Sequence, residues 1–107
     1  MGRVILYSYH GYHFTWDVEK AEKNVKKHGI AFEEACQAVI NPIQLVEEAS
    51  HEEEERWGIV SYTLSERLAF PIYVVVADAA EEGWRIISAR KATPAERSRY
   101  EEEIGSH

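Results

Sequence analysis

The sequence predicts an α+β domain, because helical and strand-like patterns of apolar residues occupy separate stretches of the chain. Apolar residues recur at helical spacing between residues 17 and 40 and again after Thr93, whereas residues 43–90 contain β-branched and aromatic runs. A length of 107 residues fits one domain, residues 1–107. The expected order is two helices, an antiparallel sheet of three or four strands and a C-terminal helix. Residues 3–9 and 12–16 are expected to add short strands around Gly11.

The first helix is expected to begin at Asp17 and to end before Gly29. Asp17 suits the N-cap, Trp16 before it can pack on Ala21, and a glycine after His28 is a typical C-terminal stop. A narrow apolar stripe is formed by Val18, Ala21 and Val25. A second, polar side of the helix is formed by Lys20, Lys23, Asn24 and Lys27.

The second helix has the clearest periodicity in the chain. Its buried stripe consists of Phe32, Ala35, Cys36, Val39 and Ile40. Pro42 disfavours a helical residue at Asn41, so the helix is expected to end there. The position of Cys36 on this stripe predicts a small core residue rather than a nucleophile. One cysteine forms no intrachain disulfide, which is typical of a protein from the reducing cytoplasm.

After Asn41 the pattern changes to that of strands. The expected strands are residues 43–46, 56–63, 68–77 and 84–90, with a hairpin connection at 79–83 and an interruption at Pro71. Short connections between consecutive strands predict antiparallel pairing. The last helix begins with a capping Thr93, a proline at its first position and Glu96 three residues after the cap.

The net charge is −7, and most of it comes from one central segment. Residues 41–66 carry one basic residue, Arg56, against seven glutamates, whereas residues 1–40 contain five basic and five acidic residues. An acidic protein binds nucleic acid poorly without a local basic site. The run Glu52–Glu55 is typical of a solvated loop.

Two long strings of residues resemble one protein family. The first runs from Phe14 through Trp16-Asp17 and Lys27-His28-Gly29-Ile30 to Phe32-Glu33-Glu34-Ala35, and the second is Arg85-Ile-Ile-Ser-Ala-Arg-Lys-Ala-Thr93 followed by Glu96 and Tyr100-Glu101. Between them lies the pattern His51-x-x-x-Glu55-Arg56. These strings resemble the BrnT family of bacterial toxins over about residues 14–101. The chain departs from the family pattern by about a dozen additional N-terminal residues, the acidic run and an insertion at Phe70-Pro71.

The resemblance implies a RelE-like ribonuclease toxin of a type II toxin–antitoxin pair. Such toxins cleave RNA without a metal or another cofactor and thereby inhibit translation. The implied partner is a cognate BrnA-type antitoxin with a ribbon-helix-helix DNA-binding part, so that the toxin reaches DNA only through its antitoxin. The chain is expected in the cytoplasm, and no stretch approaches the roughly 18 apolar residues of a membrane span.

Metal-free RNA cleavage needs a group that stabilises the phosphate and groups that transfer protons. Arginine suits the first task because its planar fork meets two phosphate oxygens, and histidine or a carboxylate suits the second. With the family resemblance, the candidate catalytic residues are His28, Glu55, Arg56, Arg85, Arg90 and Tyr100. The candidate RNA-binding residues are Lys20, Asn24, Lys27 and Lys91.

Each candidate also has a structural interpretation. Arg85 and Arg90 differ by five positions in one strand, so strict alternation places them on opposite faces, where Glu96 or Glu101 can pair with them. Arg56 and Glu55 suit a surface ion pair. Lys27 and His28 suit the negative end of a helix dipole, and Tyr100 suits the core.

Other chemistries find little support. A glycine-rich phosphate loop, a serine triad and a zinc pattern are missing from the sequence, and the pair His10 and His13 is split by strand alternation. The main alternative to an enzyme is a non-catalytic module with the toxin fold that binds an antitoxin or acts as a co-repressor.

Overall fold

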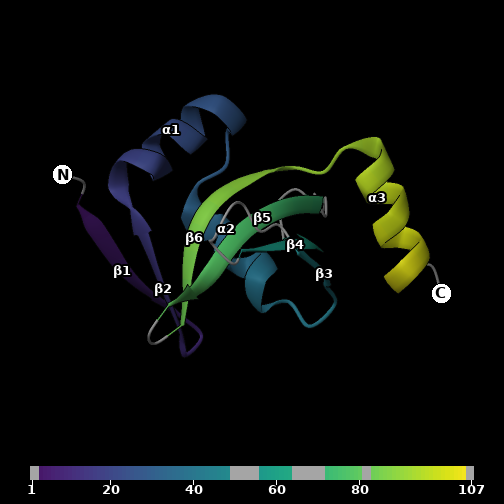
Figure 1. Ribbon diagram of the computed structural model, residues 1–107, viewed down its shortest axis with the longest axis horizontal. Coiled ribbons are helices and arrows are strands. Elements are labelled where there is room, and N and C mark those ends of the chain that lie inside the picture. Colours follow the sequence, from purple (N-terminus) through teal and green to yellow (C-terminus); the bar gives the residue numbers. More distant parts are fainter. Residues whose placement is uncertain (1–2, 49–55, 64–71, 81–82, 106–107) are drawn as a thin grey trace.

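The chain folds as a β-hairpin, two helices, four further strands and a C-terminal helix (Figure 1). The computed structural model describes residues 3–48, 56–63, 72–80 and 83–105. The strands are β1 (Val4–Tyr9), β2 (Tyr12–Asp17), β3 (Leu45–Glu48), β4 (Trp57–Tyr62), β5 (Ile72–Ala80) and β6 (Gly83–Lys91). The helices are α1 (Val18–His28), α2 (Phe32–Ile40) and α3 (Pro94–Tyr100), and a π-helical turn, Glu101–Gly105, follows α3.

The helix ends follow the predicted capping signals. The Asp17 carboxylate accepts a hydrogen bond from the Lys20 N–H at 3.0 Å. Gly29 adopts a left-handed conformation with φ of 74°, which permits its N–H to donate to the Val25 carbonyl. Thr93 and Glu96 form the predicted capping box at α3, with each side chain accepting a bond from the other residue's N–H.

The sheet is larger than predicted and mixed rather than antiparallel. Its strand order is β1-β2-β6-β5-β4-β3. β3 to β6 pair antiparallel as predicted, but β2 runs parallel to β6 through the pairs Phe14↔Trp84 and Thr15↔Arg85. The prediction of three or four strands was wrong because this pairing joins segments far apart in the sequence and has no local signal.

Strand boundaries agree with the sequence pattern for β4 and β6, whereas β5 runs to Ala80, three residues past the predicted end at residue 77, and shortens the predicted connection at 79–83. β4 and β6 lie within one residue of the predicted stretches 56–63 and 84–90, and β3 begins two residues later than the predicted start at residue 43. The expected strand start at residues 68–71, including Pro71, lies outside the described residues.

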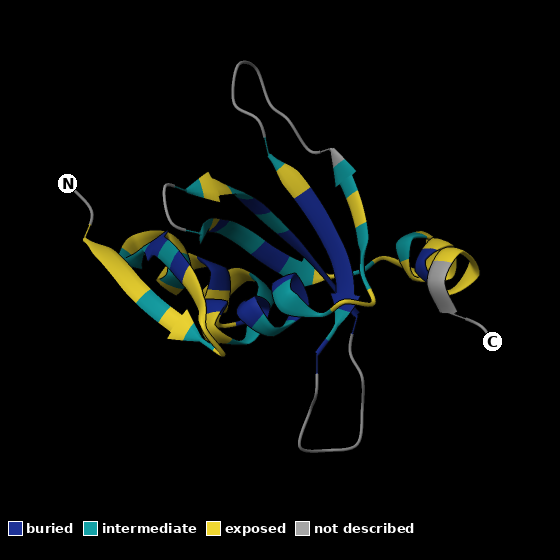
Figure 2. Cartoon of the chain, turned by 90° about the horizontal axis from the view of Figure 1, so that it is seen from below, coloured by how far each residue is buried: buried dark blue, intermediate teal, exposed yellow. Residues whose placement is uncertain are grey.

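The main core lies between the sheet and α2, and a smaller one lies on the opposite side of the sheet, under α3 (Figure 2). Phe32, Ala35 and Cys36 of α2 are fully buried in the main core, which confirms the predicted stripe and the core position of Cys36. In the smaller core, Tyr100 packs against Val74 and its neighbours.

The buried side of α1 differs from the prediction. Val25, expected on the apolar stripe, is 47% exposed, whereas Asn24, expected on the polar side, is 6% exposed. Asn24 is accommodated because its amide makes hydrogen bonds to backbone groups of neighbouring elements. The polar Asn24 is therefore buried at the position where the apolar Val25 was expected.

Candidate functional site

Arg85 and Arg90 project from the same side of the sheet. In the antiparallel ladder between β5 and β6, Arg85 pairs with Asp78 and Arg90 pairs with Val74. Directly paired residues share a face, and positions 74 and 78 of one strand also share a face. We call this side the arginine face and define it by Arg85 and Arg90 of β6 and Val74 and Asp78 of β5.

A β-bulge in β6 explains why the predicted opposite faces were wrong. The register shifts between Val76 and Ala77, so that Ile87 has no direct partner in β5. As a result Ile86 and Ala89, three positions apart, are both buried in the main core on the other side of the sheet. The extra residue reverses the alternation and returns Arg90 to the face of Arg85.

Arg85 is held by Asp78. Its Nε donates to Oδ1 of Asp78 at 3.0 Å, and a terminal nitrogen contacts Oδ2. Half of the arginine side chain stays exposed, so the ion pair sets its direction without covering it. Arg56 directly precedes Trp57, which pairs with Ala77, so the register continues Arg56 to a position beside Asp78.

Arg90 is held by Glu96, the capping residue of α3. The two terminal nitrogens of Arg90 donate to the two carboxylate oxygens of Glu96 at 2.6 and 2.9 Å. The hydrogen bond from Arg90 lowers the pKa of Glu96 to about 2, and the same bond raises the pKa of Arg90. Since Glu96 also accepts from the Thr93 N–H, the first turn of α3 orients the arginine.

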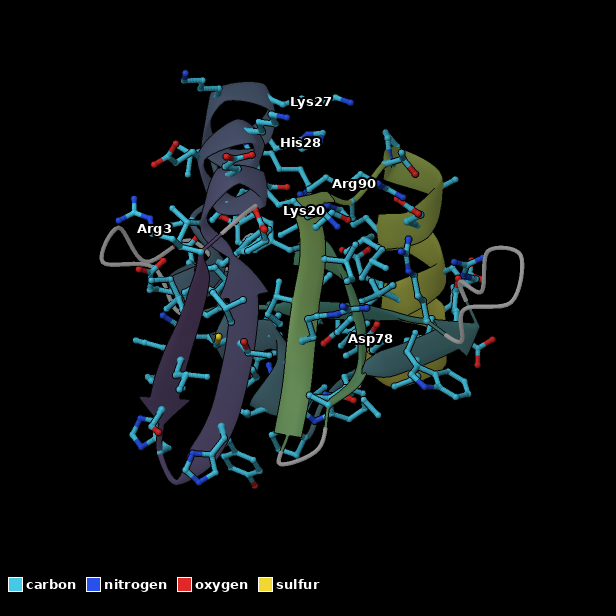
Figure 3. The ribbon with its side chains drawn as sticks, turned by 60° about the vertical axis from the view of Figure 1, so that its left-hand side comes forward. Arg3, Lys20, Lys27, His28, Asp78 and Arg90 are labelled. Atoms are coloured by element: carbon cyan, nitrogen blue, oxygen red, sulfur yellow. The ribbon has the colours of Figure 1, made fainter. Side chains whose placement is uncertain are left out.

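Three candidates from α1 lie at the same end of the molecule as Arg90. Figure 3 shows Lys20, Lys27 and His28 near Arg90, with Asp78 farther along the strands. Lys20 and Lys27 are exposed and His28 is partly exposed. These side chains add two amines and an imidazole at the end of the molecule where Arg90 lies.

Asn24 and Tyr100 are not available at this surface. The Asn24 amide is buried and bonds to the backbone of Ile30 and Ala89 at 2.9 to 3.1 Å. The Tyr100 hydroxyl donates to the Ile43 carbonyl at 2.7 Å, and burial raises its pKa. Asn24 therefore departs from the exposed position predicted for it, and Tyr100 takes the core position.

Lys91 and Glu55 complete the predicted set. Lys91 pairs with Tyr73 of the main core, so its exposed side chain projects from the side opposite the arginine face. Glu55 lies outside the described residues. Lys91 meets Arg90 only through its backbone carbonyl, which accepts a hydrogen bond from the guanidinium at 3.3 Å.

Asp78 was missed as a site residue because the predicted turn, residues 79–83, is longer than the observed one. Counting outward from the predicted turn places Ala77 opposite Arg85. In the structure Ala80 pairs with Gly83, so that 79 pairs with 84 and Asp78 pairs with Arg85. By contrast, Glu96, which pairs with Arg90, was one of the two glutamates predicted as ion-pair partners of the arginines.

The described residues contain no group of three histidine, cysteine or acidic side chains arranged to hold a metal ion. Among these same residues no helix combines the length and apolar character needed to cross a membrane.

Comparison with known proteins identifies the family. The family described as "Ribonuclease toxin, BrnT, of type II toxin-antitoxin system" matches residues 16–96, which include α1, α2, both arginines and Glu96. No curated protein matches the chain significantly. The match spans most of the chain, and β1 together with most of β2 precedes it. The chain therefore belongs to the BrnT family of ribonuclease toxins of type II toxin–antitoxin systems.

Proposed function

We propose that this protein is a RelE-like endoribonuclease of the cytoplasm that cleaves RNA without a metal ion and thereby inhibits translation. The observation that carries the proposal is the arginine face, where the bulge in β6 leaves Arg85 and Arg90 on one side of the sheet. His28 at the end of α1 adds an imidazole, the side chain that most often transfers protons in catalysis. The family supports ribonuclease chemistry in general terms.

In the proposed reaction the RNA supplies its own nucleophile. The 2′-oxygen forms a bond to the neighbouring phosphorus while its proton passes to a base, and the bond from phosphorus to the 5′-oxygen breaks as that oxygen takes up a proton. The products are a 2′,3′-cyclic phosphate and a free 5′-hydroxyl. We assign one of the two proton transfers to His28, and Glu55 stays a predicted base for the other.

Arg90 is the proposed stabiliser of the charged phosphate. Its side chain is 41% exposed, so phosphate oxygens can reach the guanidinium while Glu96 holds it. Fixed donors that meet the charge developing in a transition state are worth a factor of about 10² to 10³ in rate. Lys20 and Lys27 of α1 are proposed to bind phosphates on either side of the cleaved bond, and Arg56 stays a predicted contributor beside Asp78.

The proposed inhibitor is a cognate BrnA-type antitoxin with a ribbon-helix-helix part. A type II family implies an antitoxin partner, and the partly exposed Arg85 and Arg90 offer it charged contacts. An antitoxin segment that covers the arginine face excludes RNA from it. The complex is proposed to bind its operator DNA through the antitoxin alone.

The test compares Arg90→Ala with Arg99→Ala in RNA cleavage by the purified protein in the presence of a chelator. Arg99 is a matched control because it is also half-exposed and ion-paired, to Glu47, but belongs to α3. We expect Arg90→Ala to lower kcat by a factor of about 10² or more and Arg99→Ala to leave it unchanged. Loss of wild-type cleavage in chelator, restored by added metal, would refute the metal-free mechanism.

A non-catalytic antitoxin-binding module is the second candidate. Two observations favour it: both arginines are already paired with carboxylates, and the net charge is −7. This alternative predicts that His28→Ala and Arg90→Ala alter antitoxin affinity while RNA stays intact with every variant. Cleavage by the wild type that disappears in His28→Ala decides for the enzyme.

A further inference from the structure

A hollow of about 340 Å³ lies beside the arginine face, between the β1–β2 hairpin and the start of β6. Its lining includes Leu6, Ser8, His13, Thr15 and Gly83. Most of these residues precede the segment matched by the BrnT family. Its volume falls within the range of pockets that hold small organic groups.

The hollow is continuous with the arginine face through one row of the sheet. Leu6 pairs with Thr15 across the hairpin, and Thr15 pairs with Arg85 across the parallel contact of β2 and β6. The three side chains therefore stand on one side of three neighbouring strands. Arg85 is thus the strand neighbour of Thr15, which lines the hollow, and it bonds on its other side to Asp78.

Gly83 is required for this arrangement. It has φ of 155°, and a Cβ atom at this position would lie 2.0 Å from the carbonyl oxygen of His13. Any other residue would push β6 away from the hairpin. The close approach places the backbones of His13 and Gly83 next to each other in the lining of the hollow.

The lining combines apolar surface with a hydrogen-bonding pair. Leu6 is 85% exposed and supplies an apolar side chain that a ligand can reach. Ser8 Oγ lies 3.0 Å from Nδ1 of His13. No described residue bonds to Nε2 of the same ring, so a ligand can reach this nitrogen. The aliphatic Leu6 side chain and the imidazole of His13, with the Ser8 hydroxyl as a polar group, suit an unstacked nucleobase.

We propose that the hollow binds one base of single-stranded RNA, and that Arg85 holds the phosphate next to that base. The proposal rests on the ribonuclease function proposed above and adds a determinant of sequence preference to it. Arg85 lies four β5 positions from Arg90 along the ladder, about 13 Å at the rise of a strand. The bound base thus lies a few nucleotides from the cleaved bond and sets where the enzyme cuts.

The test measures binding of labelled 2′-O-methyl hexanucleotides of A, C, G or U, which lack the nucleophile and stay uncut. We expect the wild type to prefer one base, because contacts to a base edge distinguish the four. Leu6→Ala and His13→Ala should each lower the affinity for the preferred oligonucleotide about tenfold, which is the effect of losing one stacked base. The four oligonucleotides should then bind with similar affinities. Leu6 is exposed and His13 lies in an exposed hairpin, so both variants should fold.

Two matched variants serve as controls. His10→Ala removes the other histidine of the hairpin, which lies in the turn and outside the hollow, and Val25→Ala removes an exposed apolar side chain of α1. Both should bind all four oligonucleotides as the wild type does.

Equal binding of the four bases by the wild type, or no binding, overturns the base site. The base site is also overturned if Leu6→Ala and His13→Ala bind the oligonucleotides as the wild type does, or if these variants lose affinity only for the antitoxin. RNA cleavage is measured in parallel: a protein that cleaves without base selectivity keeps the proposed function and loses this site. If the protein binds one base selectively but does not cleave RNA, the base site stands and the proposed ribonuclease function is refuted.

Discussion

Asn24 of α1 bonds to Ala89 of β6 as a neighbouring strand would. Its Nδ2 donates to the Ala89 carbonyl at 2.9 Å, and the Ala89 N–H donates to its Oδ1 at 3.1 Å. The amide thus satisfies the edge of β6 where β2, which pairs with β6 only at positions 14 and 15, has turned into α1. A third bond, to the Ile30 carbonyl, ties the α1–α2 connection to the same point.

We expect Asn24→Ala to lower the free energy of unfolding by about 2–4 kcal/mol. The change leaves a buried N–H and two carbonyls without their partner, and each such group costs about 1–3 kcal/mol before relaxation. Urea denaturation measures the effect, with the exposed Lys23→Ala as control. A loss below about 0.5 kcal/mol would mean that water replaces the amide.

The Arg90–Glu96 pair should make stability depend on pH. The pKa of Glu96 in the folded protein is lowered to about 2, so the pair contributes stability that is present above the unfolded carboxyl pKa of about 4.5. This contribution is lost as the pH falls toward 2. Because both side chains are partly exposed, we expect Glu96→Gln to cost only about 1–2 kcal/mol at neutral pH.

Thermal unfolding from pH 7 down to pH 2 measures this difference. The stabilities of wild type and Glu96→Gln should converge at the acid end, whereas the exposed Glu102→Gln should follow the wild type throughout. A constant gap across the pH range would assign the effect of Glu96 to the helix cap instead of the ion pair.

Tyr100→Phe separates a core role from a catalytic one. The variant loses the hydroxyl bond to the Ile43 carbonyl, which should cost about 1 kcal/mol of stability. The rate of RNA cleavage should stay within about twofold of the wild type, as for the exposed control Tyr12→Phe. A cleavage rate reduced 100-fold in a normally folded Tyr100→Phe would restore this hydroxyl to the catalytic set.

Cys36 should react with thiol reagents only after the protein opens. Its side chain is fully buried, and burial raises the pKa of the thiol to about 12, so almost no thiolate exists at neutral pH. Labelling with a chromogenic disulfide should be slow in buffer and immediate in urea. Rapid labelling of the native protein would contradict the packed position of α2.

The helices could be predicted from the sequence because their signals are local. Asp17, Gly29 and the Thr93–Glu96 box act within a few residues of themselves, and the structure confirms each of them. The buried side of α1 could not be predicted, because it depends on the hydrogen bonds that Asn24 makes to the backbone of Ala89 in β6. A polar residue at helical spacing carries no sign of a distant partner.

The candidate site was predictable in composition but not in arrangement. Arg85, Arg90 and His28 were recognised by residue type and family pattern, and they stay predictions for catalysis. Their common face depends on the bulge at Ile87, whose extra residue is visible only in the register with β5. The membership of β2 in the same sheet depends on a pairing between distant segments, which alternation within one strand does not reveal.

The bulge also makes β6 one residue longer than strand alternation requires. Removing the single codon for Ile87 would leave every charged side chain in the gene product and would place Arg85 and Arg90 four positions apart, so that regular alternation keeps them on one face. Ile86 and Ala89 would then be two positions apart, and both would stay in the core. In-frame deletion at this point is thus expected to leave the two faces of β6 as they are and to be tolerated better than replacement of either arginine.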